Sequence, residues 1–229
     1  MQKPNLNKSI VSRYEDDPSA IALENREAKG CGPRQYSPSA GRNKAVVAEQ
    51  LTRLLQADAH VLEIASGTGE HGQAVCSVRD DISWQYSDPD PASRLSQDDW
   101  RKDFPMQLRP SLPLDMTAPD WWGGLPNYSA IYAANMIHIA PIEACEGLAW
   151  GAAHILPAGG CVILYGPFLD GKNSAPSNLE FDKSLKSRKP QWGVRNQSLV
   201  KHIFAKAGFN ATQLIAMPKN NHIFVFSRD

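Results

Sequence analysis

One stretch of this sequence combines two glycines with acidic residues, and the types and spacing of these residues suit the binding of a small charged ligand. Residues 61–72 read VLEIASGTGEHG, in which an apolar run leads into a glycine-rich turn. Glu63 lies within the apolar run, and Gly67 and Gly69 lie in the turn. Glycine lets a backbone pass close to a ligand and adopt dihedral angles that other residues avoid. We therefore expect a strand, a tight turn and a helix, with a ligand bound at the turn.

Residues 67–72 also match the dinucleotide-binding pattern G-x-G-x-x-G, and Asp88 follows at about the 20-residue spacing of an acid that binds a ribose hydroxyl. This pattern favours an NAD(P)-dependent oxidoreductase. The acidic residues argue against it, because Glu63 precedes the turn and Glu70 opens the next helix, where a pyrophosphate would meet their charge. The same carboxylates suit a ligand that carries a sulfonium and an ammonium. We interpret Gly72 as a coincidence of spacing, and the dinucleotide stays open as the alternative.

The elements that would position these residues alternate along the chain. Apolar runs predict five strands, at residues 60–65, 82–87, 112–114, 128–134 and 161–165. Helical periodicity predicts helices at residues 39–56, 70–78, 92–101, 141–156, 177–188 and 198–207. Two final strands, at residues 211–216 and 222–226, would form a hairpin. The order predicts an α/β fold, a three-layer sandwich with a mostly parallel seven-stranded sheet and a C-terminal antiparallel hairpin.

Polar residues follow the later strands of this scheme. Asp115 follows the third strand and Asn135 the fourth, and a proline-glycine turn at residues 156–160 precedes the fifth. With the acid-x-x-x-Gly-x-Gly motif of the first turn, these features resemble the class I S-adenosylmethionine-dependent methyltransferases, which have a Rossmann-like fold. One branch is more similar still, the uncharacterised methyltransferase-like family filed as domain of unknown function 938. That similarity extends over residues 36–228 and rests on residues 37–44, 61–71, 84–91, 134–139, 165–168 and 220–221.

The resemblance implies S-adenosyl-L-methionine as the cofactor, S-adenosyl-L-homocysteine as the product and no metal. Glu63 and the backbone of the turn would face the methionine part of the cofactor. Asp88 would accept both ribose hydroxyls, with the N-cap of the next helix as its alternative role. Asp115 and Met116 would approach the adenine. The cofactor-binding residues predicted in this way are Arg42, Asn43, Glu63, Ala65, Ser66, Gly67, Gly69, Asp88, Asp115, Met116 and Asn135.

Three of these positions lie outside the usual pattern of strand-end acids and turn glycines. Arg42 and Asn43 lie on the first expected helix, where they would contact the methionine carboxylate or tie the helix to its surroundings. Ala65 stands where most class I enzymes have glycine. The branch that this sequence resembles tolerates alanine there, so we expect no loss of cofactor binding.

The methyl acceptor is expected near the end of the fourth strand, where Asn135 and His138 are the candidate catalytic residues. A neutral histidine is able to take a proton from a nucleophile. A half-buried histidine that bonds the backbone is the structural alternative. The predicted acceptor-pocket residues are Tyr36, His138, Tyr165, Pro167 and Phe168. We expect methyl transfer to a small molecule, and a cofactor-binding scaffold without turnover is the non-enzymatic alternative.

Composition narrows the partners and the location. Lys plus Arg and Asp plus Glu both number 24, so the formal net charge is zero and a nucleic-acid partner is not expected. The four cysteines are far apart, and the longest apolar run is broken by polar residues, so we expect a cytoplasmic protein without a membrane span. Residues 1–33 are expected to be a mobile leader or lid, with a helix at residues 19–29, and residues 34–229 the methyltransferase domain.

Overall fold

The computed structural model describes residues 26–28 and 32–228. Within them a seven-stranded sheet has the strand order β5-β4-β3-β6-β7-β9-β8, and it is mostly parallel and flanked by helices. Strand β9 runs antiparallel between β7 and β8. The α/β fold with a C-terminal antiparallel hairpin is therefore confirmed. The strands of this sheet are β3 (His60–Ile64), β4 (Ser83–Ser87), β5 (Leu108–Leu112), β6 (Ala130–Ala134), β7 (Cys161–Pro167), β8 (Ala211–Met217) and β9 (Asn221–Ser227).

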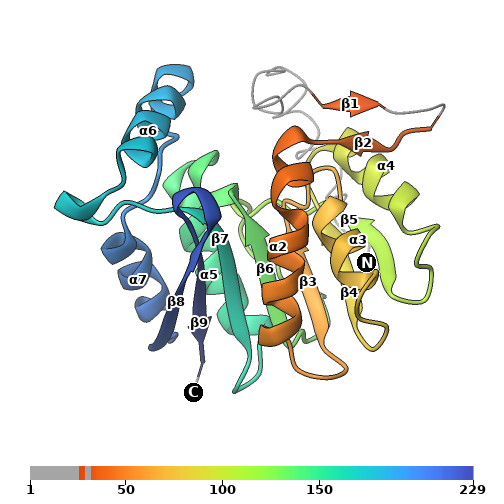
Figure 1. Ribbon diagram of the computed structural model, residues 1–229. Helices are drawn as coiled ribbons and strands as arrows, with labels where there is room; N and C mark the ends of the chain where they lie inside the picture. The colour runs from red at the N-terminus through yellow and green to blue at the C-terminus, as the bar shows by residue number, and fades with distance from the viewer. Residues whose placement is uncertain (1–25, 29–31, 229) are drawn as a thin grey trace. The chain divides into compact units, whose positions relative to one another are not determined.

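The chain folds as two compact units, and the first takes its described residues from Met1–Asp58 and Ala65–Asp115. It contains a two-stranded pair, β1 (Glu27–Ala28) and β2 (Gln35–Tyr36), followed by helix α2 (Pro38–Leu54). Helix α2 begins where the Ser37 side chain caps it and Pro38 fixes the first turn. It packs against α3 (Glu70–Cys76), and both α3 and α4 (Pro91–Trp100) contact β4 and β5 (Figure 1).

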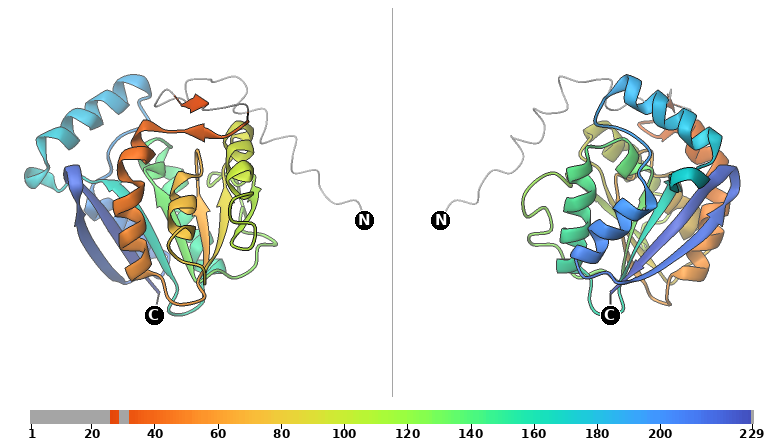
Figure 2. Two further views of the ribbon diagram at one scale, coloured as in Figure 1. Left: turned by 45° about the vertical axis from the view of Figure 1, so that its right-hand side comes forward. Right: turned by 90° about the vertical axis from the view of Figure 1, so that its left-hand side faces the viewer.

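The second unit comprises Ala59–Ile64 and Met116–Asp229. Its strands β3, β6 and β7 pair in parallel, and the apolar residues of these strands are almost fully buried. Helix α5 (Ile142–Ile155) packs against α7 (Gln197–Lys206), and Figure 2 shows these two helices side by side. The helix α6 (Pro176–Arg188) and the short 3-10 turn Met136–His138 complete the part of this unit that concerns the site.

Two sequence predictions about elements were wrong. Strand β5 spans Leu108–Leu112 rather than residues 112–114, because it is an edge strand, where a residue such as Pro110 without an N–H is tolerated. A helix was expected over residues 19–29, yet Glu27–Ala28 form β1, which pairs with Gln35–Tyr36. Residues 1–25 and 29–31, which make up most of the expected leader, lie outside the described residues. No helix among the described residues is both long enough and apolar enough to cross a membrane.

Candidate functional site

The glycine turn between β3 and α3 adopts a left-handed backbone at alternate residues. The φ angles are 53° at Ala65, 56° at Gly67 and 87° at Gly69. Its second residue, Ser66, is bonded to the end of β4 in both directions: its N–H donates to Ser87 O at 2.8 Å, and its Oγ accepts from Ser87 N–H at 3.1 Å. The predicted turn is therefore held in one conformation against the end of β4.

Side chains of β4 and α4 satisfy the carbonyl groups of this turn. A Cβ at Gly69 would lie only 3.0 Å from the Trp100 ring, so the turn packs tightly on α4. At Gly67, by contrast, a Cβ would be in ordinary contact with Arg26 Nη2, at 3.8 Å. The turn is therefore packed tightly against α4 at Gly69 and less tightly at Gly67. The hydrogen bonds join Gln97 Nε2 to Gly67 O (2.9 Å), Ser96 Oγ to Thr68 O (2.8 Å) and Tyr86 Oη to Gly69 O (2.7 Å).

Asp88 is buried at the end of β4, beside the turn. Its Oδ2 accepts from Gly67 N–H at 2.9 Å and its Oδ1 accepts from Asp90 N–H at 2.9 Å. Each carboxylate oxygen has a further lone pair available for a hydroxyl donor. Burial raises the pKa of Asp88 to about 6; the two backbone N–H groups and the charge of Arg26 lower it, whereas the charge of Asp90 raises it.

The cap of helix α4 is Asp90. Its side chain accepts from Ala92 N–H at 3.2 Å and from Ser93 N–H at 2.9 Å. The alternative role considered for Asp88 was to cap this helix. Asp90 caps it instead. Arg26 approaches the same cap, with its Nη1 at 3.6 Å from Asp90 Oδ2.

Glu70 ties the start of α2 to the glycine turn. Its side chain is 2% exposed and accepts from Ser37 N–H at 2.7 Å, from Thr68 Oγ1 at 3.1 Å and from Lys44 Nζ at 3.1 Å. The carboxylate therefore links α2 to the glycine turn and places a buried negative charge at the first turn of α3.

Asn43 makes a similar tie. Its Oδ1 lies 2.8 Å from Nε2 of His71, which is buried in α3. Burial, with a smaller effect from Lys44, lowers the pKa of His71 to about 4. Of the two roles considered for Asn43, this contact favours the structural tie.

Gly72 has a packing role that the sequence did not predict. A Cβ at this position would lie 2.5 Å from Trp84 Nε1 and 2.6 Å from Tyr86 Cε1. Only glycine allows α3 to approach β4 this closely. The requirement comes from helix–strand packing and is independent of the ligand.

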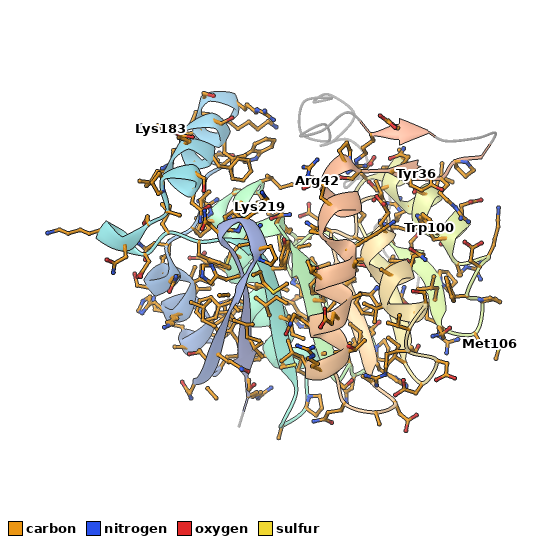
Figure 3. The ribbon with its side chains drawn as sticks, in the orientation of Figure 1. Tyr36, Arg42, Trp100, Met106, Lys183 and Lys219 are labelled. Atoms are coloured by element: carbon orange, nitrogen blue, oxygen red, sulfur yellow. The ribbon has the colours of Figure 1, made fainter. Side chains whose placement is uncertain are left out.

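The first unit also holds Tyr36, Arg42 and Asp115. Tyr36 meets the Trp100 ring edge-on, with the ring centroids 5.5 Å apart, and Figure 3 shows the two side chains near each other. Arg42 is exposed near the start of α2 (Figure 3). Asp115 is buried, at 7% exposure, three residues after β5.

Glu63 and Met116 belong to the second unit. Glu63 is 1% exposed in β3 and lies opposite Tyr132 of β6. Met116 is buried, and its carbonyl oxygen would be 1.9 Å from a Cβ on Gly147, so α5 packs directly on this backbone. The contacts predicted for Glu63 and Met116 with the cofactor stay predictions.

A polar cluster of the second unit brings Asn135 and His138 together with Gly166. Asn135 has a left-handed backbone with φ of 58°, and its N–H donates to Tyr165 O at 2.8 Å. A Cβ on Gly166 would lie 2.8 Å from His138 Nε2 and 2.9 Å from Asn135 Oδ1. The predicted catalytic residues are thus neighbours at the carboxyl ends of β6 and β7. The Phe168 ring meets the His138 ring edge-on, with the ring centroids 5.5 Å apart. Pro167, which precedes Phe168, is also buried.

The hydrogen bonds of His138 assign its tautomer. Its Nδ1 lies 3.3 Å from the Arg195 N–H, and we interpret this contact as a hydrogen bond that leaves the proton of the neutral ring on Nε2. Burial, then the charge of Arg195, lower the pKa of His138 to about 3, and a backbone hydrogen bond with Gly193 raises it, so the ring is neutral at neutral pH. Nε2 is buried and has no hydrogen-bond acceptor among the described residues. The ring therefore offers a donor at Nε2. The sequence left two roles open, a general base and a histidine bonded to the backbone, and the contact with the Arg195 N–H agrees with the second.

Several residues of the site were not predicted from the sequence. Arg195 positions His138, and its guanidinium also donates to Ile137 O at 2.8 Å and to Ala140 O at 2.7 Å. Arg26, directly before β1, contacts Asp90 and the Cβ position of Gly67. The sequence carries no local signal for either arginine, since each acts on a distant segment. Among the described residues there is no group of three or more His, Cys, Asp or Glu side chains arranged to hold a metal ion.

Solved methyltransferase structures share this fold at low sequence identity. An O-methyltransferase family protein from Burkholderia thailandensis matches with a TM-score of 0.72 and 13% identity, over 83% of this chain and 56% of that chain. An O-methyltransferase family 2 protein from Planctomyces limnophilus, solved with apigenin, gives 0.69 and 17%, over 83% and 59%. Human N-acetylserotonin methyltransferase, solved with SAM, gives 0.63 and 15%, over 82% and 51%. The chain thus spans a little more than half the length of these proteins.

The family is identified by sequence. The fold and the two strand-end clusters agree with a methyltransferase-like scaffold, and a family model covers nearly all of the described chain. Since that model matches residues 34–228, the chain belongs to the family described as Protein of unknown function (DUF938).

Proposed function

We propose that this protein is an S-adenosylmethionine-dependent methyltransferase that acts on a small molecule. The observation that carries the proposal is the carboxylate of Asp88, which is held by the N–H groups of Gly67 and Asp90 and is not needed as a helix cap. A carboxylate fixed in this way suits the two hydroxyls of a ribose. Gly67, whose N–H bonds this carboxylate, has a left-handed backbone that brings the chain close to a ligand, so the residues present fit an adenosine-containing cofactor.

The charges of the first unit favour this cofactor over a dinucleotide. A pyrophosphate would have to sit at the first turn of α3, where the buried Glu70 carboxylate lies. The cofactor proposed here has no pyrophosphate, so the Glu70 carboxylate, which is paired with Lys44, does not oppose its binding. The roles of Arg42, Glu63, Asp115 and Met116 in holding the methionine and adenine parts remain predictions from the resemblance.

The acceptor side of the proposal rests on the second unit. S-adenosylmethionine, when bound, supplies a methyl group that is already activated by its sulfonium. The protein's own residues then have to position the acceptor and exclude water. We propose that Asn135 Oδ1 and the Nε2–H of His138 orient the acceptor, and that Tyr165, Pro167 and Phe168 border it. The acceptor-pocket role of Tyr36 stays a prediction from the resemblance. The structures solved with SAM and with apigenin support an adenosine cofactor and a small acceptor in proteins of this fold.

The test is isothermal titration of S-adenosylhomocysteine into the wild-type protein, Asp88→Ala and the control Asp80→Ala. Asp80 is exposed, so this control removes an equal charge away from the turn. We expect binding to the wild type and to Asp80→Ala, and a loss of at least about 100-fold in Asp88→Ala, because two charge-assisted hydrogen bonds are removed. Absence of binding to the wild type would refute the proposal, and equal binding to Asp88→Ala would refute the role of Asp88.

Two further outcomes separate the alternatives. Binding of NADPH in place of S-adenosylhomocysteine would favour the oxidoreductase. If S-adenosylhomocysteine binds but no product forms when S-adenosylmethionine is incubated with a metabolite extract, the cofactor-binding scaffold is favoured. Mass spectrometry of the extract, searching for added methyl groups, would identify the acceptor.

A further inference from the structure

Arg26 is a charged residue directly before β1 that no part of the proposed function uses. It stands directly before Glu27–Ala28, which pair with Gln35–Tyr36 of β2. Strand β2 is in turn bonded to α4, because Gln35 N–H donates to Ser96 Oγ at 2.8 Å. The neighbouring Arg34 reinforces this attachment, with its Nε at 2.8 Å from Asp99 Oδ2. The backbone that carries Arg26 is therefore fixed relative to the glycine turn within the same unit.

One edge of the Arg26 guanidinium is occupied by protein groups and the other faces the turn. Nη1 donates to Ser93 Oγ at 2.7 Å and to Gln35 Oε1 at 3.3 Å, and it lies 3.6 Å from Asp90 Oδ2. Nη2 lies 3.8 Å from the Cβ position on Gly67, the residue whose N–H bonds Asp88. The side chain is 25% exposed. Nη1 is thus held by protein groups, and Nη2 lies beside the residue that holds the Asp88 carboxylate.

We propose that Arg26 is a cofactor-binding residue whose Nη2–H donates to a ribose hydroxyl that Asp88 holds. This inference rests on the proposed function. A hydroxyl that donates its proton to Asp88 keeps two lone pairs, and burial without a donor for them is unfavourable. A guanidinium supplies that donor and has no acceptor that would compete for the hydroxyl proton. Asp88 and Arg26 together would therefore satisfy both hydrogen-bonding capacities of one hydroxyl.

The charges agree with this arrangement. Asp88 and Asp90 are two buried carboxylates two residues apart, and Arg26 is the cation that acts on the pKa of Asp88. Without it, the pKa of Asp88 would rise further above its ordinary value, and fewer molecules would hold the carboxylate form that accepts hydroxyl protons. Arg26 thus contributes in two separable ways, as a hydrogen-bond donor and as a positive charge.

Titrations of S-adenosylhomocysteine and of its 2′-deoxy and 3′-deoxy ribose analogues would test the donor role. The proteins are the wild type, Arg26→Met and the control Arg53→Met, since Arg53 is exposed and paired only with Glu49. We expect Arg26→Met to weaken S-adenosylhomocysteine binding by about 10- to 100-fold. One of the two deoxy analogues lacks the hydroxyl that Arg26 would contact, and we expect Arg26→Met and the wild type to bind that analogue equally. Arg53→Met should bind like the wild type. If Arg26→Met proves unfolded by circular dichroism, Arg26→Lys takes its place in the same comparison.

The pH dependence separates the donor from the charge. The pH at which S-adenosylhomocysteine affinity falls to half should be higher in Arg26→Met than in the wild type, and unchanged in Arg26→Lys, which keeps the charge but presents a different donor geometry. The inference would be overturned if Arg26→Met bound with wild-type affinity, or if it weakened the binding of all three ligands equally. Arg26 would then have a structural role only. Because these outcomes require a wild type that binds, they are distinct from failure of the proposed function, in which the wild type does not bind.

Discussion

Ala65, at the first position of the glycine turn, has a backbone conformation that is unfavourable for an L-residue. Its φ of 53° lies in the left-handed region, where a Cβ crowds the following carbonyl oxygen, at a cost of about 1–2 kcal/mol. Alanine at this position therefore stores strain that a glycine would release. Part of that release is offset because glycine also increases the entropy of the unfolded chain.

We predict that Ala65→Gly raises the free energy of unfolding by about 0.5–1 kcal/mol and leaves S-adenosylhomocysteine affinity within about twofold. The matched control is Ala45→Gly, in the exposed face of helix α2, which should lower the free energy of unfolding by about 0.5–1 kcal/mol. Urea denaturation measures both. A destabilised Ala65→Gly would show that the turn gains more from the alanine side chain than its strain costs.

His138 is a second residue whose chemistry follows from its immediate contacts. Its Nδ1 bonds the Arg195 N–H, and burial with the charge of Arg195 lowers its pKa to about 3. We predict that NMR of the ring nitrogens shows a protonated Nε2 and an unprotonated Nδ1 at pH 7, with no imidazolium forming between pH 7 and about 5. The variant His138→Gln, which lacks these signals, assigns them. A proton on Nδ1, or a titration near 6.5, would contradict the donor assignment and restore the general-base interpretation.

At the scale of elements, the contact between α3 and β4 depends on a single absent side chain. A Cβ on Gly72 would overlap the Trp84 and Tyr86 rings, which are themselves fully buried and unable to move away. We predict that Gly72→Ala lowers the free energy of unfolding by about 1–3 kcal/mol. The control is Gly41→Ala in α2, where a Cβ meets nothing within 4 Å, and which should raise it by about 0.5–1 kcal/mol. Equal effects of the two variants would show that helix propensity, and not packing, governs position 72.

The elements also show what the sequence could predict. The turn at Gly67 and Gly69 is a local event between a strand and a helix, so its residues carry a local pattern, and the alternation of apolar runs identified the fold class. The contacts of Arg26 with Ser93 and of Arg195 with His138 join residues 67 and 57 positions apart, and no local pattern encodes such pairs. The packing role of Gly72 was missed for the same reason, because it depends on the Trp84 and Tyr86 rings of β4.

For the whole molecule, the buried titratable groups determine how stability varies with pH. His71 and His138 have pKa values lowered by burial, and by Lys44 and Arg195 respectively, to about 4 and about 3, so both are neutral in the folded protein at pH 5. In the unfolded chain they take up protons below about 6.5, which stabilises the unfolded state as the pH falls. Asp88 acts in the opposite direction, because its pKa is raised to about 6 and the folded state takes up its proton first.

Between pH 7 and pH 5 each of these histidines therefore removes about 2 kcal/mol of stability, and Asp88 restores about 1 kcal/mol. We predict a net fall of about 2–3 kcal/mol in the free energy of unfolding, measured by urea denaturation of the ligand-free protein at both pH values. Replacing His71 by Gln, which removes one titrating group and keeps a side-chain amide for Asn43, should reduce this fall by about 2 kcal/mol. A stability that stays constant or increases on acidification would mean that the histidines are not held neutral, and a His71→Gln variant with the wild-type pH dependence would exclude His71 as a source of the acid sensitivity.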